Sequence, residues 1–128
     1  MGGTGRDTME EKIRFIKYEG KNILHLDFSN CTAEEVLNTI TKAKKVIAAH
    51  PEQSLLTLTD VTGARFSEAV TQEMKVFTAH NRPYVRAGAV VGVTGLKRII
   101  FQAVIAFSGR KLSTFDSVEK AKQWLVKN

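Results

Sequence analysis

Apolar and polar positions alternate in two short stretches near the start of the chain, and later apolar positions recur at helical spacing. Residues 12–18 and 22–28 alternate on either side of a glycine-bearing turn, which predicts a β-hairpin. Short, nearly continuous apolar runs predict three further strands, at residues 54–59, 87–93 and 111–115. Apolar residues spaced as on one helix face predict four helices, at residues 32–50, 67–83, 99–107 and from 116 onward.

Polar residues mark where three of these helices begin. Thr32 and Glu35 have the spacing of a capping box, in which each side chain bonds the backbone N–H of the other residue. The run from Asp116 to Glu119 repeats this pattern before the last helix. Ser67 precedes the second helix and can accept a hydrogen bond from an N–H group of its first turn.

The elements follow in the order β-β-α-β-α-β-α-β-α. Strands that alternate with helices form mostly parallel sheets with helices packed against them, and the opening hairpin adds one antiparallel pair. We therefore expect an α/β fold with a mixed, mostly parallel five-stranded sheet and four helices, in one domain at residues 12–128. Residues 1–11 contain three glycines and no apolar period, which predicts a disordered tail.

Composition narrows the class of protein. Apolar residues make up 43% and charged residues 25% of the 128 positions, as in an ordinary soluble globular domain. No apolar run reaches the ~18 residues that span a bilayer, and the N-terminus lacks the apolar core of a secretory signal. Cys31 is the only cysteine, which excludes an internal disulfide and suits a reducing compartment. We expect a cytoplasmic protein without stable membrane insertion.

The net charge of +6 favours acidic partners, such as nucleic acid, anionic lipid or an acidic protein face. The cations are scattered in small groups, however, and no aromatic residues are interleaved with them. This pattern argues against nucleic-acid binding and favours solvated helix faces.

The stretch from Leu55 to Glu68 joins an apolar strand, a glycine-bearing loop and a helix start. In open α/β sheets, ligands and partners gather where strands end and helices begin. The residues of this loop are therefore candidates for binding a partner or for a phosphorylation switch: Asp60, Thr62, Gly63, Arg65 and Ser67. Ser67 has two compatible roles, because it can cap the helix and can accept a phosphate where the helix N-terminus favours an anion.

A second candidate site follows the strand at residues 87–93. Gly95 permits a turn, and Lys97 and Arg98 place two cations in the first helical turn, where the helix dipole disfavours them unless an anion is bound. Together with Phe101 of the apolar helix, these residues are candidates for binding an anion or a lipid. The alternative is a pair of solvated side chains beside a core helix.

The apolar helix also bears on assembly. Six large apolar residues cannot all face one side of a helix: Ile99, Ile100, Phe101, Val104, Ile105 and Phe107. Burying each of them contributes about 1.5–3 kcal/mol, so leaving even two in water is costly. We therefore expect a homodimer with this helix at or near the interface, because two-fold dimers are the commonest oligomers.

Enzyme chemistry has the least support in the sequence. His25, His50 and His80 lie on different predicted elements, and none has a Cys or carboxylate at metal-binding spacing. Cys31 stands beside a predicted helix cap, where a thiol can be activated, but no partner base is visible. We expect a non-enzymatic role without a catalytic residue, metal or cofactor.

Three segments carry a family resemblance: Asp60-Val61-Thr62 followed by Ser67, residues 96–101 (LKRIIF), and Phe115-Asp116-Ser117 with Ala121 and Trp124-Leu125. In these segments the chain resembles a STAS domain, and in particular the SpoIIAA-like branch, over about residues 12–128. The resemblance implies the element order given above and a regulatory module that binds a protein, like the bacterial anti-sigma-factor antagonists. Through the related CRAL-TRIO fold it also implies a lipid ligand as the alternative.

The switch motif departs from that of the antagonists. They carry Asp-Ser-Ser-Gly, whereas this chain reads Arg65-Phe66-Ser67-Glu68. Only the second serine is kept, and Glu68 would repel a phosphate on Ser67, although Arg65 would offset part of that repulsion.

Overall fold

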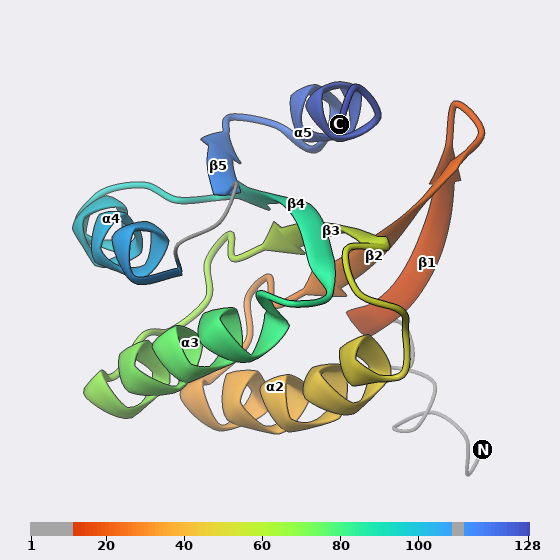
Figure 1. Cartoon of the computed structure of the whole chain (residues 1–128). Coiled ribbons are helices and arrows are strands. Elements are labelled where there is room, and N and C mark those ends of the chain that lie inside the picture. Colours follow the sequence, from red (N-terminus) through yellow and green to blue (C-terminus); the bar gives the residue numbers. More distant parts are fainter. Residues whose placement is uncertain (1–11, 109–111) are drawn as a thin grey trace, which may run out of the picture.

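The computed structural model describes residues 12–108 and 112–128 (Figure 1). The tail expected at residues 1–11 lies outside the described residues. The strands of this part of the chain are β1 (Ile13–Tyr18), β2 (Lys21–Asp27), β3 (Leu55–Asp60), β4 (Val85–Val91) and β5 (Leu112–Phe115). Its helices are α2 (Ala33–Ala48), α3 (Glu68–Asn81), α4 (Leu96–Ser108) and α5 (Val118–Leu125).

The strands form one sheet in the order β1-β2-β3-β4-β5, so each strand pairs with its neighbour in sequence. β1 and β2 are antiparallel, and β2 to β5 are parallel. The hairpin turn uses Glu19 and Gly20, both with positive φ (48° and 80°), as a two-residue turn between twisted strands requires. This architecture confirms the predicted α/β class, the mixed five-stranded sheet and the element order.

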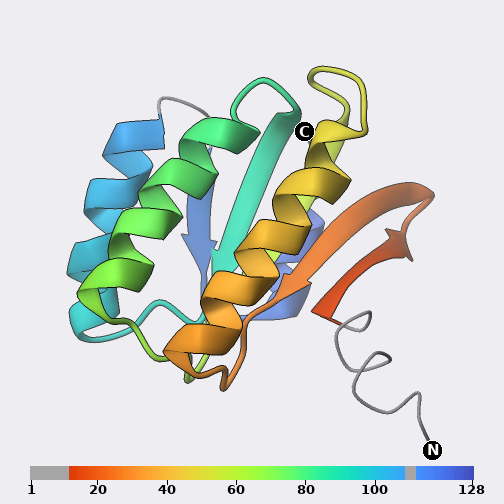
Figure 2. The same ribbon diagram turned by 90° about the horizontal axis from the view of Figure 1, so that it is seen from below.

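The helices cover the two faces of the sheet unequally. α2, α3 and α4 pack on one face, and α5 alone packs on the other (Figures 1 and 2). Each parallel crossover advances one strand in the same direction, and because such crossovers are right-handed, their helices fall on the same face. The strand order therefore has no switch point, and the candidate site is defined by the loops at the carboxyl ends of the strands.

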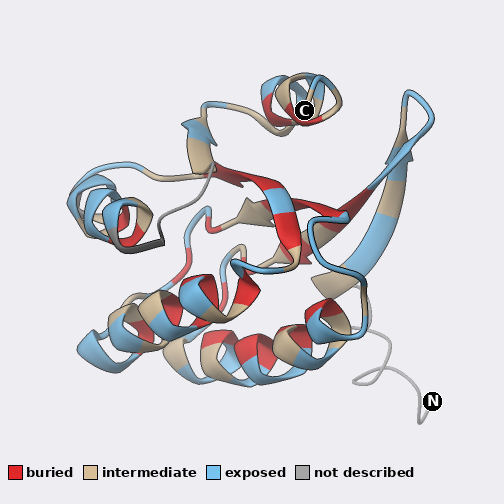
Figure 3. Cartoon of the chain, viewed as in Figure 1, coloured by how far each residue is buried: buried red, intermediate tan, exposed pale blue. Residues whose placement is uncertain are grey.

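β2 shows how the sequence divides the core in two. Leu24 and Leu26 point into the larger cluster under α2, α3 and α4, whereas Ile23 points into the smaller cluster under α5. All three are at most 1% exposed, so the strand is buried on both faces (Figure 3). Ala121 and Leu125 of α5 close the smaller cluster.

The predicted helix caps are confirmed at two positions and shifted at the third. Thr32 and Glu35 form the reciprocal capping box, at 2.9 and 3.2 Å, and the N–H of Thr32 lowers the pKa of the Glu35 carboxyl. At α5 the capping residue is Ser117, whose oxygen accepts from the N–H of Lys120 at 3.2 Å. The capping box predicted over residues 116–119 is therefore wrong, because the cap lies one residue later and Lys120 occupies the N3 position. Glu119 instead accepts a hydrogen bond from the Tyr18 hydroxyl, at 2.7 Å.

α4 buries more of its apolar surface than its sequence pattern suggests. Phe101 and Val104 are 3% and 0% exposed in the larger cluster, and Ile100 and Ile105 are partly buried. Ile99 is 66% exposed, and the side chain of residue 107 lies outside the description. The homodimer stays a prediction, and among the described side chains of this helix it now rests on Ile99.

Candidate functional site

The loops that follow β2 and β3 are bonded to each other at the carboxyl edge of the sheet. The N–H of Asn30 donates to the carbonyl oxygen of Thr62 at 2.8 Å, and the N–H of Arg65 donates to that of Cys31 at 3.0 Å. These two bonds hold the β3–α3 loop (residues 61–67) at Thr62 and at Arg65. The loop that the sequence selects as a candidate site is thus fixed to its neighbour through its backbone.

Two glycines permit this close approach. Gly63 has a φ of 69°, and a Cβ there would overlap the side chain of Asn30. Gly92, directly after β4, has a φ of 91°, and a Cβ there would overlap both the side chain and the backbone of Thr62. Glycine is favoured at both positions because other residues rarely adopt positive φ, and at Gly92 the backbone of Thr62 also leaves no room for a side chain.

Asp60 and Asp27 are partners in the register of β3 and β2, and each shapes the turn that follows it. Asp60 accepts from the N–H of Thr62, and Asp27 accepts from the N–H of Ser29, both at 2.9 Å. A carboxylate that bonds the N–H two residues later stabilises a turn locally. Asp60 therefore has a structural role in the β3–α3 loop.

Ser67 caps α3 and remains exposed. Its oxygen accepts from the N–H of Val70 at 3.2 Å, and the flanking residues Arg65 and Glu68 are exposed as well. The predicted capping role is confirmed. A switching role for Ser67 stays a prediction, as do the partner-binding roles of Asp60, Thr62, Gly63 and Arg65.

Lys97 joins the two candidate sites that the sequence keeps apart. Its ammonium group donates to the carbonyl oxygen of Val61 at 3.1 Å and lies 6.0 Å from the ring centre of Phe66. Phe66 also packs edge-on against Phe101 of α4, with ring centres 5.6 Å apart. The β3–α3 loop and the start of α4 therefore form one continuous surface, and Lys97 is occupied by the protein itself.

Arg98 differs from Lys97 in having no hydrogen-bond or ion-pair partner among the described residues. Its side chain is exposed, and Gly95 before it turns the chain with a φ of 57°. Of the two cations predicted to bind an anion, Arg98 is thus the one left available for a ligand.

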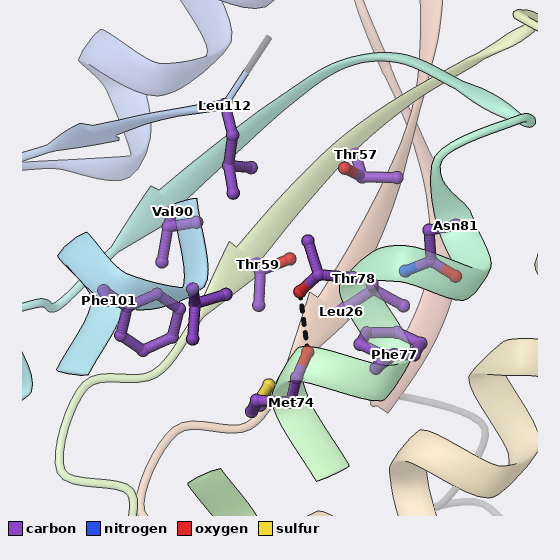
Figure 4. A pocket seen from close by; sticks show the side chains of 11 residues that line it. Leu26, Thr57, Thr59, Met74, Phe77, Thr78, Asn81, Val90, Phe101 and Leu112 are labelled. Atoms are coloured by element: carbon purple, nitrogen blue, oxygen red, sulfur yellow. Dashed lines mark hydrogen bonds between the residues drawn. The ribbon is translucent and has the colours of Figure 1, made fainter. Parts of the chain in front are cut away.

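A small cavity lies between the sheet and α3, with α4 along its side (Figure 4). Its walls are mainly apolar, but Thr57, Thr59, Thr78 and Asn81 bring polar groups into it. The volume of about 20 Å³ is close to the space that one water molecule needs. The sequence reading missed this cavity, although two threonines at alternate positions of a central strand are an unusual signal.

His25 is the described residue whose buried polar atom has no partner. Its Nδ1 is buried without a hydrogen bond, on the face of the sheet that carries α5. Burial lowers the pKa of His25; the nearby cations of Arg14 and Lys122 also lower it, whereas the carboxylates of Asp27 and Asp60 raise it. The sequence predicts a half-exposed strand residue here, but not an imidazole held towards its neutral form.

Cys31 is buried, at 1% exposure, and its sulfur accepts a hydrogen bond from the ammonium group of Lys12 at 3.4 Å.

Within residues 12–108 and 112–128, no three His, Cys, Asp or Glu side chains are grouped as metal ligands. In the same residues no helix has both the length and the apolar character to cross a bilayer.

Comparisons with known proteins bear on the fold. No family model matches the sequence, and no curated protein matches it. The structure is similar to the crystal structure of an uncharacterised protein of the DUF3478 family from Shewanella loihica PV-4, which has a SpoIIAA-like fold. The TM-score is 0.67 at 16% sequence identity, over 88% of this chain and 91% of that one. The chain therefore has a SpoIIAA-like fold, which is consistent with the predicted STAS-like domain.

Proposed function

We propose that this chain is a non-enzymatic regulatory or protein-interaction module, and that a partner protein binds the β3–α3 loop and the first turn of α3. The observation that supports this proposal is the position of Ser67, exposed at a helix N-terminus in a loop with a bonded backbone. A surface held in one arrangement loses little conformational entropy on binding. Less of the favourable interaction free energy is then offset, and the affinity is higher.

The charges around Ser67 determine how a modification would act. A phosphate there would add a charge of about −1.5 to −2 beside the free N–H groups of α3, which favour anions. The exposed Arg65 would attract it, and the adjacent Glu68 would repel it. Phosphorylation would then make this local surface, where Arg65 and Glu68 balance each other, negative, while leaving oxygen atoms available to cap the helix.

Comparing variants at two helix caps tests this function. The protein and its Ser67→Ala and Ser67→Asp variants serve as bait in extracts of the source cell, and a captured partner is identified, purified and titrated. Ser117→Ala and Ser117→Asp are matched controls, because Ser117 caps α5 on the other face of the sheet. We expect Ser67→Asp to weaken binding and both Ser117 variants to retain it.

Mass spectrometry of protein from the source cell completes this test by searching for a phosphate on Ser67. If neither Ser67 variant changes the binding of any partner and no phosphate is found, the switch is contradicted. A partner that is lost equally with the Ser117 variants would indicate a general loss of stability instead.

The second candidate function is the binding of an anion or lipid through Gly95, Lys97, Arg98 and Phe101. The exposed guanidinium of Arg98, for which residues 12–108 and 112–128 provide no hydrogen-bond or ion-pair partner, favours it. The 20 Å³ cavity between the sheet and α3 is too small for a lipid chain, so a lipid that entered there would require α4 to move away from the sheet. Native mass spectrometry of gently purified protein tests this alternative, because a retained ligand adds a non-protein mass.

A further inference from the structure

A second cavity opens beside α4, between this helix and β5. Figure 1 shows these two elements at one end of the molecule. The volume of this cavity is about 130 Å³. Six of the described residues line this α4–β5 cleft: Val93, Arg98, Phe101, Gln102, Ile105 and Thr114.

The sequence places these residues together through simple periodicities. The four residues from α4 are spaced i, i+3, i+4 and i+7, which is one stripe of a helix. β5 is the last strand of the sheet, so no further strand pairs with its outer edge. The cleft therefore arises where a helix stripe meets the open edge of the sheet.

The lining is divided into an apolar floor and a polar mouth. Phe101 is buried, and Val93 and Ile105 are partly buried, whereas the side chains of Arg98, Gln102 and Thr114 are exposed. Among the described residues that line the cleft there is no carboxylate. Arg98, which has no partner among the described residues, thus stands with two neutral polar groups above an apolar floor.

We propose that the α4–β5 cleft binds a small monocarboxylate with a short apolar body. The guanidinium of Arg98 presents paired N–H donors that match the two oxygens of a carboxylate. A bound anion also offsets the unfavourable position of this cation in the first turn of α4. This ligand is additional to the protein-interaction function and does not depend on it.

The size and floor of the cleft set the limits on the ligand. An apolar cavity of roughly 150 Å³ holds one benzene molecule, so this cleft has room for a body of about six carbons or fewer. Three apolar side chains on the floor favour such a body over inorganic phosphate, which would leave them in contact with a charged group.

NMR titration of ¹⁵N-labelled protein tests the proposal with three probes: hexanoate, hexan-1-ol and inorganic phosphate. We expect hexanoate to shift the amide signals of the residues lining the cleft in a saturable way. Hexan-1-ol has the same C5H11 tail with CH2OH in place of the carboxylate and should bind at least about tenfold more weakly, because its neutral hydroxyl cannot form a bidentate ion pair with Arg98. Phosphate at the same concentration should leave these signals in place.

Two variants assign the effect to Arg98. Arg98→Gln removes the exposed guanidinium and should weaken hexanoate binding by about tenfold or more. Arg82→Gln is the matched control, since Arg82 is also an exposed arginine but lies at the C-cap of α3 and does not line the cleft. Equal hexanoate binding by the native protein and Arg98→Gln would overturn the proposal. So would equal binding of hexan-1-ol, displacement of hexanoate by phosphate, or the absence of saturable shifts.

Discussion

The ammonium group of Lys97 in α4 donates a hydrogen bond to the carbonyl oxygen of Val61, 36 residues earlier in the chain, over 3.1 Å. The same group lies above the ring of Phe66, which in turn packs on Phe101. The backbone carbonyl of Val61, directly after β3, therefore accepts a hydrogen bond from a side chain of α4. This arrangement makes the conformation of the β3–α3 loop depend on the position of α4.

Lys97→Met should loosen the β3–α3 loop. The substitution keeps a long apolar stem but removes the donor to Val61, so we expect a loss of about 1 kcal/mol in the free energy of unfolding. Amide hydrogen exchange should become faster at residues 62–66. Lys45→Met, at an exposed position of α2, is the control. Unchanged exchange in the loop would show that Lys97 does not hold it.

Gly92→Ala should destabilise the protein more than Gly20→Ala. Both glycines have positive φ, but a Cβ at Gly20 meets nothing within 4 Å, whereas one at Gly92 overlaps Thr62. Backbone strain alone costs about 1–3 kcal/mol at such positions, so Gly20→Ala measures strain and Gly92→Ala adds the overlap. Urea unfolding compares the two variants. Equal losses would mean that Thr62 moves aside without cost.

The free energy of unfolding should fall as the pH drops below about 6.5, the ordinary pKa of histidine, because of His25. Its folded-state pKa is lowered, chiefly by burial, so the unfolded chain takes up the proton first. The stabilising contribution of the neutral ring is therefore present above the unfolded pKa, about 6.5, and is lost as the pH falls towards the folded pKa. Urea midpoints measured between pH 8 and pH 5 should decline less for His25→Gln than for the native protein. Parallel declines would contradict the role of His25.

The predicted homodimer should depend on Ile99. This side chain is 66% exposed, whereas Phe101 is buried, so Ile99→Glu tests an interface without disturbing the core. In sedimentation equilibrium we expect the native protein to dimerise and Ile99→Glu to associate at least about tenfold more weakly. Val76→Glu, at another exposed apolar position, is the control. A native protein that remains monomeric at millimolar concentration would disprove the dimer.

Local patterns were sufficient to predict most of the fold. The spacing of Thr32 and Glu35 predicts a reciprocal cap because both partners lie within one helical turn. The alternation of Ile23 and Leu24 predicts opposite faces of β2, and the structure buries both. The last cap was predicted one residue too early, since Asp116 and Ser117 are both good capping residues and their order alone does not decide between them.

Contacts between distant residues could not be predicted in the same way. Nothing near Lys97 in the sequence indicates that it bonds Val61, so the sequence pattern groups it with Arg98 as a candidate anion-binding cation. The unpartnered nitrogen of His25 likewise depends on what α5 and the neighbouring strands place around it. The α4–β5 cleft depends on how far a helix stands from an edge strand, which side-chain periodicity does not specify.

The order β1-β2-β3-β4-β5 has a consequence for how the chain folds. Because every strand pairs with the strand next to it in sequence, no strand has to enter between two that are already paired. The β1–β2 hairpin is the most local contact, and each later strand needs only one helix and its loops to reach the growing edge. Short closures of this kind favour rapid folding. The sheet can therefore assemble from the hairpin outward, in the direction in which a ribosome delivers it.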